Sequence, residues 1–151
     1  MIRVILGFVL AVLVAFLVGG AALSWFDQAG YLAAAGAGTT LSIGERLSWY
    51  VNELKGLGVT VGFYPILLAA GLAIAFLVAA IVQRVAPGLR FWWYAGAGAV
   101  ALIVMVFSLK LAMGLKVLPG ARTMAGVAAQ GVAGLIAGAV FAITSRRTQG
   151  R

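Results

Sequence analysis

Residues 4–26, VILGFVLAVLVAFLVGGAALSWF, form an apolar stretch without a charged side chain. A membrane-spanning helix needs about 20 such residues to cross the hydrocarbon core of a bilayer. Three further uncharged stretches occupy residues 56–83, 91–109 and 123–145. The sequence therefore predicts an all-α membrane protein with four transmembrane helices in an up-down bundle, at about residues 2–23, 63–83, 91–113 and 123–144.

The composition places the whole chain in a membrane. Of its 151 residues, 64% are hydrophobic and 9% are charged, which lies far outside the usual composition of soluble globular domains. Four helices leave one substantial segment outside the bilayer, so we expect a single domain over residues 1–151. The chain has no Cys and no His, which excludes disulfides, thiol chemistry and imidazole-ligated haem or zinc. We expect no cofactor and no metal site.

The formal net charge of +8 arises from eleven Lys and Arg residues against three acids. In a soluble protein this balance would suggest nucleic acid, but here the bases stand singly or in pairs at the ends of the predicted helices. A base near the membrane surface gains about 1 kcal/mol from anionic lipid headgroups. We therefore expect a bilayer with anionic headgroups, and not nucleic acid, as the partner of these charges.

The positions of the bases also bear on orientation, because cytoplasmic loops carry an excess of Lys and Arg. With a cytoplasmic N-terminus, that side holds Arg3, Arg84, Arg90, Arg146, Arg147 and Arg151, and the other side holds Arg46, Lys55, Lys110, Lys116 and Arg122. This small excess favours two cytoplasmic termini in a bacterial-type inner (plasma) membrane. The apolar run after Arg3 also resembles a signal peptide, but it continues to Trp25 and Phe26, which favours an uncleaved anchor.

The segment after the first predicted helix is harder to assign. Trp25 and Phe26 form an aromatic pair typical of the headgroup level, and Asp27 marks the expected exit from the membrane. Residues 29–40 carry no charge but are too short and too rich in glycine for a membrane span. We expect a loop on the membrane surface here; a shallow re-entrant segment is the alternative.

A short amphipathic helix is predicted at about residues 42–55. Ser42 and Glu45 fit a capping box, in which each side chain accepts a hydrogen bond from a backbone N–H at the helix start. Lys55 and Gly56 fit the helix end, as a favourable charge and a C′ glycine. The apolar residues of one face, with Trp49 beside them, are Ile43, Leu47, Tyr50, Val51 and Leu54. This pattern predicts an extracytoplasmic helix that lies in the membrane interface or caps the bundle.

Two connections share the pattern basic-Val-x-Pro-Gly-x-Arg, at residues 84–90 (RVAPGLR) and 116–122 (KVLPGAR). Pro-Gly favours a type II turn, because proline sets the first central residue and glycine accepts a positive φ at the second. The two segments therefore predict helical hairpins with basic ends; internal duplication is the alternative.

The last predicted helix carries a seam of small residues and one amide at four-residue spacing: Gly126, Gln130, Gly134, Gly138 and Ala142. Small residues let helix backbones approach closely, and an amide in lipid needs a partner across the interface. We expect the seam to be buried against the chain's own helices. A homo-oligomer or a partner membrane protein is the alternative.

Few side chains are candidates for chemistry. Lys110 is the one ionisable residue expected inside the hydrocarbon region, but it lies near a helix end, from which a long side chain reaches the headgroups. A role with an ion or a substrate is the alternative for Lys110. Carboxylate chemistry would depend on Asp27, Glu45 or Glu53, and their spacing shows no catalytic pair. We predict no catalytic residue.

These features favour a non-enzymatic small membrane protein that acts as a subunit, assembly factor or scaffold of a membrane complex, with the helix at residues 42–55 as its contact surface. One alternative is an oligomeric transporter or channel for ions or small solutes. A less favoured alternative is a membrane enzyme that acts on a lipid-linked substrate.

Overall fold

The structure is a computed structural model that describes residues 2–36, 40–60, 64–113 and 123–145. Its elements are α1 (Ile2–Ala35), α2 (Ile43–Lys55), a π-helical turn (Gly56–Thr60), α3 (Tyr64–Val85), a 3-10 turn (Pro87–Leu89), α4 (Arg90–Met113) and α5 (Met124–Thr144). Within the described residues α1, α3, α4 and α5 are long and apolar enough to cross a membrane, which confirms the prediction of four such helices. The bounds of α3, α4 and α5 lie within two residues of the predicted ranges.

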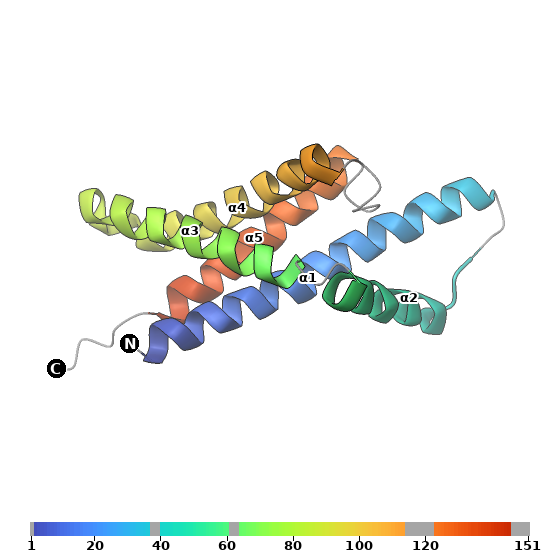
Figure 1. The fold of residues 1–151 in the computed structure, drawn as a ribbon, viewed down its shortest axis with the longest axis horizontal. Helices are drawn as coiled ribbons and strands as arrows, with labels where there is room; N and C mark the ends of the chain where they lie inside the picture. Colours follow the sequence, from blue (N-terminus) through green and yellow to red (C-terminus); the bar gives the residue numbers. More distant parts are fainter. Residues whose placement is uncertain (1, 37–39, 61–63, 114–122, 146–151) are drawn as a thin grey trace.

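α5 makes the most extensive contacts of the fold, with α1 and with α4, while α3 packs mainly on α4 (Figure 1). At one end of the molecule the Arg90 guanidinium, at the start of α4, donates a 2.8 Å hydrogen bond to Ser145 Oγ, just after α5. At the same end Gly7 lies against Thr144. The start of α1, the start of α4 and the end of α5 therefore lie close together.

An aromatic cluster joins the four long helices toward that end. Phe76 of α3 stacks on Phe141 of α5 with a centroid distance of 4.4 Å, and Tyr94 of α4 lies 5.0 Å from the Phe141 ring. Phe8 of α1 meets Phe76 edge to face at 6.4 Å. Stacked and edge-to-face pairs of this kind add attraction beyond simple burial. The cluster therefore fixes the four helices relative to one another.

A second buried cluster includes the π-helical turn after α2. Leu57 of that turn is buried with residues of the four long helices, Leu23, Tyr64, Val106, Leu109 and Val127. Gly56 has helical φ and ψ of −59° and −48°, and its N–H bonds to the carbonyls of Asn52 and Glu53. The prediction of a C′ glycine at Gly56 is therefore wrong, because the helical path continues beyond Lys55 and carries Leu57 into the cluster.

α1 is much longer than predicted. The expected surface loop at residues 29–40 is wrong for residues 29–35, which continue the helix to Gly36, where φ is +93°. The alanines of this run are good helix formers, and Asp27 is accommodated by a hydrogen bond from α2. The 34 residues of α1 span about 51 Å, against about 30 Å for the hydrocarbon core. Its last third projects beyond the other long helices, with α2 beside it (Figure 1).

The first Pro-Gly connection is a 3-10 turn rather than the predicted type II turn. Gly36 is the only described glycine with a positive φ, so Gly88 lacks the conformation that a type II turn needs. The three-residue turn leads directly into α4 at Arg90, which makes α3 and α4 a helical hairpin. The second pair, Pro119 and Gly120, lies outside the described residues.

Candidate functional site

The polar chemistry of the chain gathers where α2 packs beside the projecting part of α1. We call residues 17–36 and 40–55 the α1–α2 unit. Asp27 stands on α1, and Glu45 and Glu53 stand on α2, so all three acids of the chain belong to this unit. Their spacing in the sequence did not indicate this arrangement, which arises from the packing of the two helices.

The start of α2 has the predicted capping box. The Ser42 backbone N–H donates to Glu45 Oε2 at 2.7 Å, and the Glu45 N–H donates to Ser42 Oγ at 3.3 Å. The backbone and hydroxyl donors of Ser42 lower the pKa of Glu45 below its ordinary value. Glu45 is therefore kept as a carboxylate that stabilises the helix start.

The end of α2 packs closely on the middle of α1. Tyr50 Oη donates to the Leu17 carbonyl at 3.1 Å. The Leu54 side chain covers Gly20, where a Cβ would lie 2.6 Å from Leu54 Cδ2. A side chain at position 20 would therefore require Leu54 to shift.

The start and middle of α2 contact a polar edge of α1. Ser24 and Gln28 are buried, and Gln28 Nε2 donates to Ser24 Oγ at 2.9 Å and to the Arg46 backbone carbonyl at 3.3 Å. Trp49 Nε1 donates to Asp27 Oδ2 at 3.3 Å. Sequence reasoning did not identify Ser24 or Gln28 as site residues, although their four-residue spacing places them on one face of a helix.

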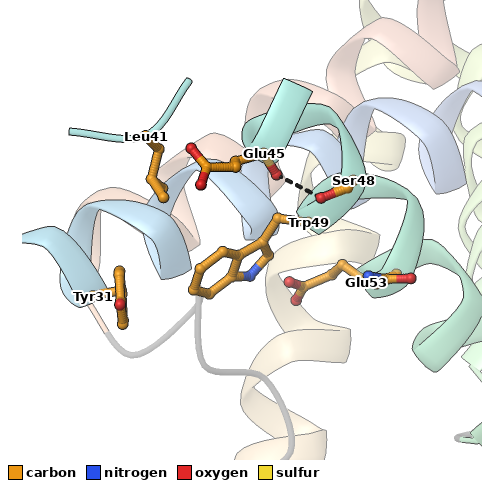
Figure 2. A pocket seen from close by; sticks show the side chains of 7 residues that line it. Tyr31, Leu41, Glu45, Ser48, Trp49 and Glu53 are labelled. Carbon is orange, nitrogen blue, oxygen red and sulfur yellow. Dashed lines mark hydrogen bonds between the residues drawn. The ribbon is translucent and has the colours of Figure 1, made fainter. Parts of the chain in front are cut away.

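A pocket of about 430 Å³ opens beside Trp49 (Figure 2). It is lined by Tyr31, Leu41, Glu45, Ser48, Trp49, Asn52 and Glu53. The Tyr31 and Trp49 rings lie 5.1 Å apart, centroid to centroid. The Ser48 hydroxyl is occupied within its own helix, because it donates to the Glu45 carbonyl at 2.9 Å (Figure 2). Tyr31 was expected in a loop, and the structure places it on α1.

Glu53 lies half-buried on the wall of this pocket, and its pKa is raised above the ordinary value. Burial is the main cause, and the negative charge of Asp27 adds to it. No Lys or Arg among the described residues forms an ion pair with either carboxylate. Two like charges thus lie near each other without a described base to offset them, in a chain of net charge +8.

The predicted interfacial residues of α2 divide between two environments. The exposed residues, at 86%, 60% and 39%, are Ile43, Leu47 and Val51, which we call the α2 stripe. The partly buried residues, which contact α1, are Trp49, Tyr50 and Leu54. The apolar face of α2 therefore has one edge against α1 and one edge exposed.

The structure buries the whole predicted seam of α5 inside the chain, at Gly126, Gln130, Gly134, Gly138 and Ala142. Gly134 and Gly138 meet the α4 backbone at Gly98 and Tyr94 so closely that a Cβ on either glycine would collide with a carbonyl oxygen. Gln130 contacts α1. The seam therefore packs α5 against α4 and α1 in this structure.

Lys110 lies near the end of α4 and is partly buried. Its ammonium nitrogen is 5.6 Å from the centre of the Phe107 ring. An aromatic face attracts a cation, and the C-terminal end of a helix does the same. Both interactions stabilise a positive charge at this position.

Among the described residues, no group of three or more His, Cys, Asp and Glu side chains could hold a metal ion. A comparison of the chain with models of known protein families, with curated proteins and with solved structures found no match. We therefore infer the function from the geometry of the α1–α2 unit.

Proposed function

We propose that the protein is a non-enzymatic subunit, assembly factor or scaffold of a membrane complex. Its contact surface is the side of the α1–α2 unit that carries the pocket, and its partner is a membrane protein with a basic segment close to the bilayer. The observation that supports this proposal is the pair of carboxylates, Asp27 and Glu53, which lie near each other beside an aromatic pocket without a described counter-ion.

A basic partner would relieve an unfavourable arrangement of charge. The raised pKa of Glu53 means that its ionised form is less stable here than in water. A Lys or Arg side chain from a partner would be attracted by Asp27 and Glu53 together. Tyr31 and Trp49 add flat apolar area of the kind found at the centres of protein interfaces, and their rings also attract cations.

The arrangement of the long helices supports an up-down passage through the bilayer. α5 runs antiparallel to α4 and to α1, and the start of α1 lies at the end of α5. This arrangement supports two termini on one side of the membrane, and the distribution of bases favours the cytoplasmic side of a bacterial-type inner membrane. α2 then lies at the opposite surface, with its stripe toward the lipid and the pocket toward water.

The test is the composition of the complex extracted from native membranes in a mild detergent, by total protein mass and by identification of each chain. We expect a second protein in fixed stoichiometry. Glu53→Lys should release that protein, because it places a positive charge toward a basic segment. Gly44→Lys is the matched control, since Gly44 is exposed on the same helix and does not line the pocket.

Two outcomes would count against the proposal. A complex whose mass is a simple multiple of the 15.5 kDa chain would contradict it and would favour the oligomeric transporter or channel, which flux measurements on reconstituted liposomes would then examine. If Glu53→Lys and Gly44→Lys retained the partner equally, the contact surface would not be at the pocket.

A further inference from the structure

A second concave surface lies on the other side of the contact between α1 and α2. This groove has a volume of about 280 Å³, and its α1 wall includes Ala21, Ser24, Trp25 and Gln28. Its α2 wall includes Ile43 and Leu47 of the α2 stripe, together with Arg46. We call it the α1–α2 groove. It shares no residue with the pocket beside Trp49.

The groove lies where α1 leaves the hydrocarbon core. A helix that enters the core near Val4 rises about 30 Å over 20 residues and reaches the headgroup level near Leu23. Trp25 is 63% exposed beside the groove, and tryptophan is enriched at this level of a bilayer. The end of the groove at Ala21 therefore lies at the depth of the acyl chains, and the end at Gln28 and Arg46 lies at the depth of the lipid phosphates.

Arg46 is the charged side chain in the lining of the groove. Its guanidinium carbon lies 5.6 Å from the Trp25 ring centre, and its Nε donates to the Leu41 carbonyl at 3.4 Å. No described carboxylate forms an ion pair with Arg46, since Glu45 caps the helix and the Asp27 carboxylate accepts from Trp49. The planar guanidinium suits a phosphate, to which it can donate two hydrogen bonds at once.

Gln28 forms the polar base of the groove. Its side chain is only 4% exposed, and its Nε2 has two acceptors. Its Oε1 accepts no hydrogen bond from the described residues. That oxygen is itself buried, so a ligand in the groove meets the Arg46 guanidinium as its polar contact.

We propose that the α1–α2 groove binds one anionic phospholipid. The phosphate lies at Arg46, and an acyl chain runs along Ala21 and Leu47. This bound lipid would fill the space between α1 and α2 and stabilise the α1–α2 unit. The proposal is independent of a protein partner, because that partner would contact the opposite side of α2.

The test is native mass spectrometry of the delipidated full-length protein in detergent, titrated with dioleoyl phosphatidylglycerol or with dioleoyl phosphatidylcholine. We expect the first phosphatidylglycerol to bind more tightly than the first phosphatidylcholine. Arg46→Gln should weaken the first phosphatidylglycerol about five-fold and leave phosphatidylcholine unchanged. Arg46→Lys retains the charge and should keep the preference. Arg84→Gln, at an exposed base on α3, is the control and should behave as the wild type.

A steric variant separates the groove from general surface charge. Ala21→Phe should fill the groove and weaken both lipids while Arg46 remains present. Inorganic phosphate at matched ionic strength should not displace the lipid, because it makes no acyl contacts. The proposal would be overturned by equal effects of Arg46→Gln and Arg84→Gln, by normal lipid binding in Ala21→Phe, or by displacement of phosphatidylglycerol by inorganic phosphate.

Discussion

Gln130 Nε2 donates a 2.7 Å hydrogen bond to the Gly19 carbonyl, and this contact joins α5 to α1 across 111 positions of sequence. Gln130 is completely buried, and its Oε1 has no partner among the described residues. A Cβ at Gly19 would lie 3.0 Å from that oxygen, which is closer than ordinary van der Waals contact. The amide and the small residues of the seam therefore act together in one helix contact.

Two replacements of Gln130 should distinguish the contribution of its hydrogen bond to stability from the contribution of its packing. Interhelical hydrogen bonds in membranes contribute about 0.6 kcal/mol on average, so Gln130→Leu, which keeps most of the volume, should change stability by less than about 1 kcal/mol. Gln130→Ala also opens a cavity and should cost at least about 2 kcal/mol. The free energy of unfolding in mixed micelles titrated with sodium dodecyl sulfate measures both. If Gln130→Leu and Gln130→Ala lowered the free energy of unfolding equally, packing would not be the main contribution of Gln130 to stability.

The close approach of α4 and α5 at Gly98 and Gly134 gives a second prediction. A Cβ at Gly98 would collide with the Gly134 carbonyl, and backbone atoms cannot move aside as a flexible side chain can. Gly98→Ala should therefore lower the free energy of unfolding by about 1–3 kcal/mol, as overpacking does in other cores. Gly96→Ala, two residues away on the same helix, meets nothing within 4 Å and should be neutral or slightly stabilising. A similar loss of unfolding free energy in Gly98→Ala and Gly96→Ala would show that the close contact between α4 and α5 does not determine the effect.

The positions of the long helices could be predicted because the thickness of the bilayer sets the length of each apolar run. The capping box at Ser42 and Glu45 could be predicted because it involves residues three positions apart. The end of α1 could not be predicted in this way. Asp27 is typical of a membrane boundary, and its hydrogen bond with Trp49 cannot be seen in the sequence. Local signals therefore predicted the elements, and a tertiary contact decided where the first of them ends.

The site was harder to predict for the same reason. The pocket combines Tyr31 of α1 with Trp49 and Glu53 of α2, and sequence spacing does not show which faces of two helices meet. The apolar pattern of α2 was visible, but not its division between a buried edge at Leu54 and an exposed edge at Leu47. The residues of α2 were therefore predictable as a group, while their separate environments depend on the packing of α1.

The extended end of α1 can be tested with two glycines of the same helix. Gly30 lies in the helix interior, where an added Cβ would meet nothing within 4 Å, so Gly30→Ala should stabilise residues 29–35 by about 0.5–1 kcal/mol. Gly36 has a φ of +93°, so Gly36→Ala should cost about 1–2 kcal/mol at the helix end. Hydrogen exchange of the amides of residues 29–35 should slow in the first variant and quicken in the second. Rapid exchange in all forms would contradict a helix in this segment.

The carboxylates of α2 predict a dependence on pH. The pKa of Glu53 is raised in the folded state above its ordinary value of 4.5. The packing of α2 on α1 is therefore most favourable at pH values below 4.5, and it weakens as the pH rises through the pKa of the folded state. Glu53→Gln removes the ionised form, so it should slow hydrogen exchange of the α2 amides near neutral pH. The difference from the wild type should disappear at about pH 4, where Glu53 itself becomes protonated.

Glu45 on the same helix provides the opposite case. The donors of Ser42 lower the pKa of Glu45. The contribution of Glu45 to the stability of α2 is therefore present at pH values above its ordinary pKa and is lost as pH falls through its pKa in the folded state. Glu45→Gln should therefore quicken exchange at the start of α2 near neutral pH, where Glu53→Gln slows it. Exchange rates corrected for the intrinsic effect of pH on free amides provide the comparison. Changes of the same sign in both variants would mean that the loss of a negative charge, rather than the separate surroundings of the two carboxylates, controls the stability of α2.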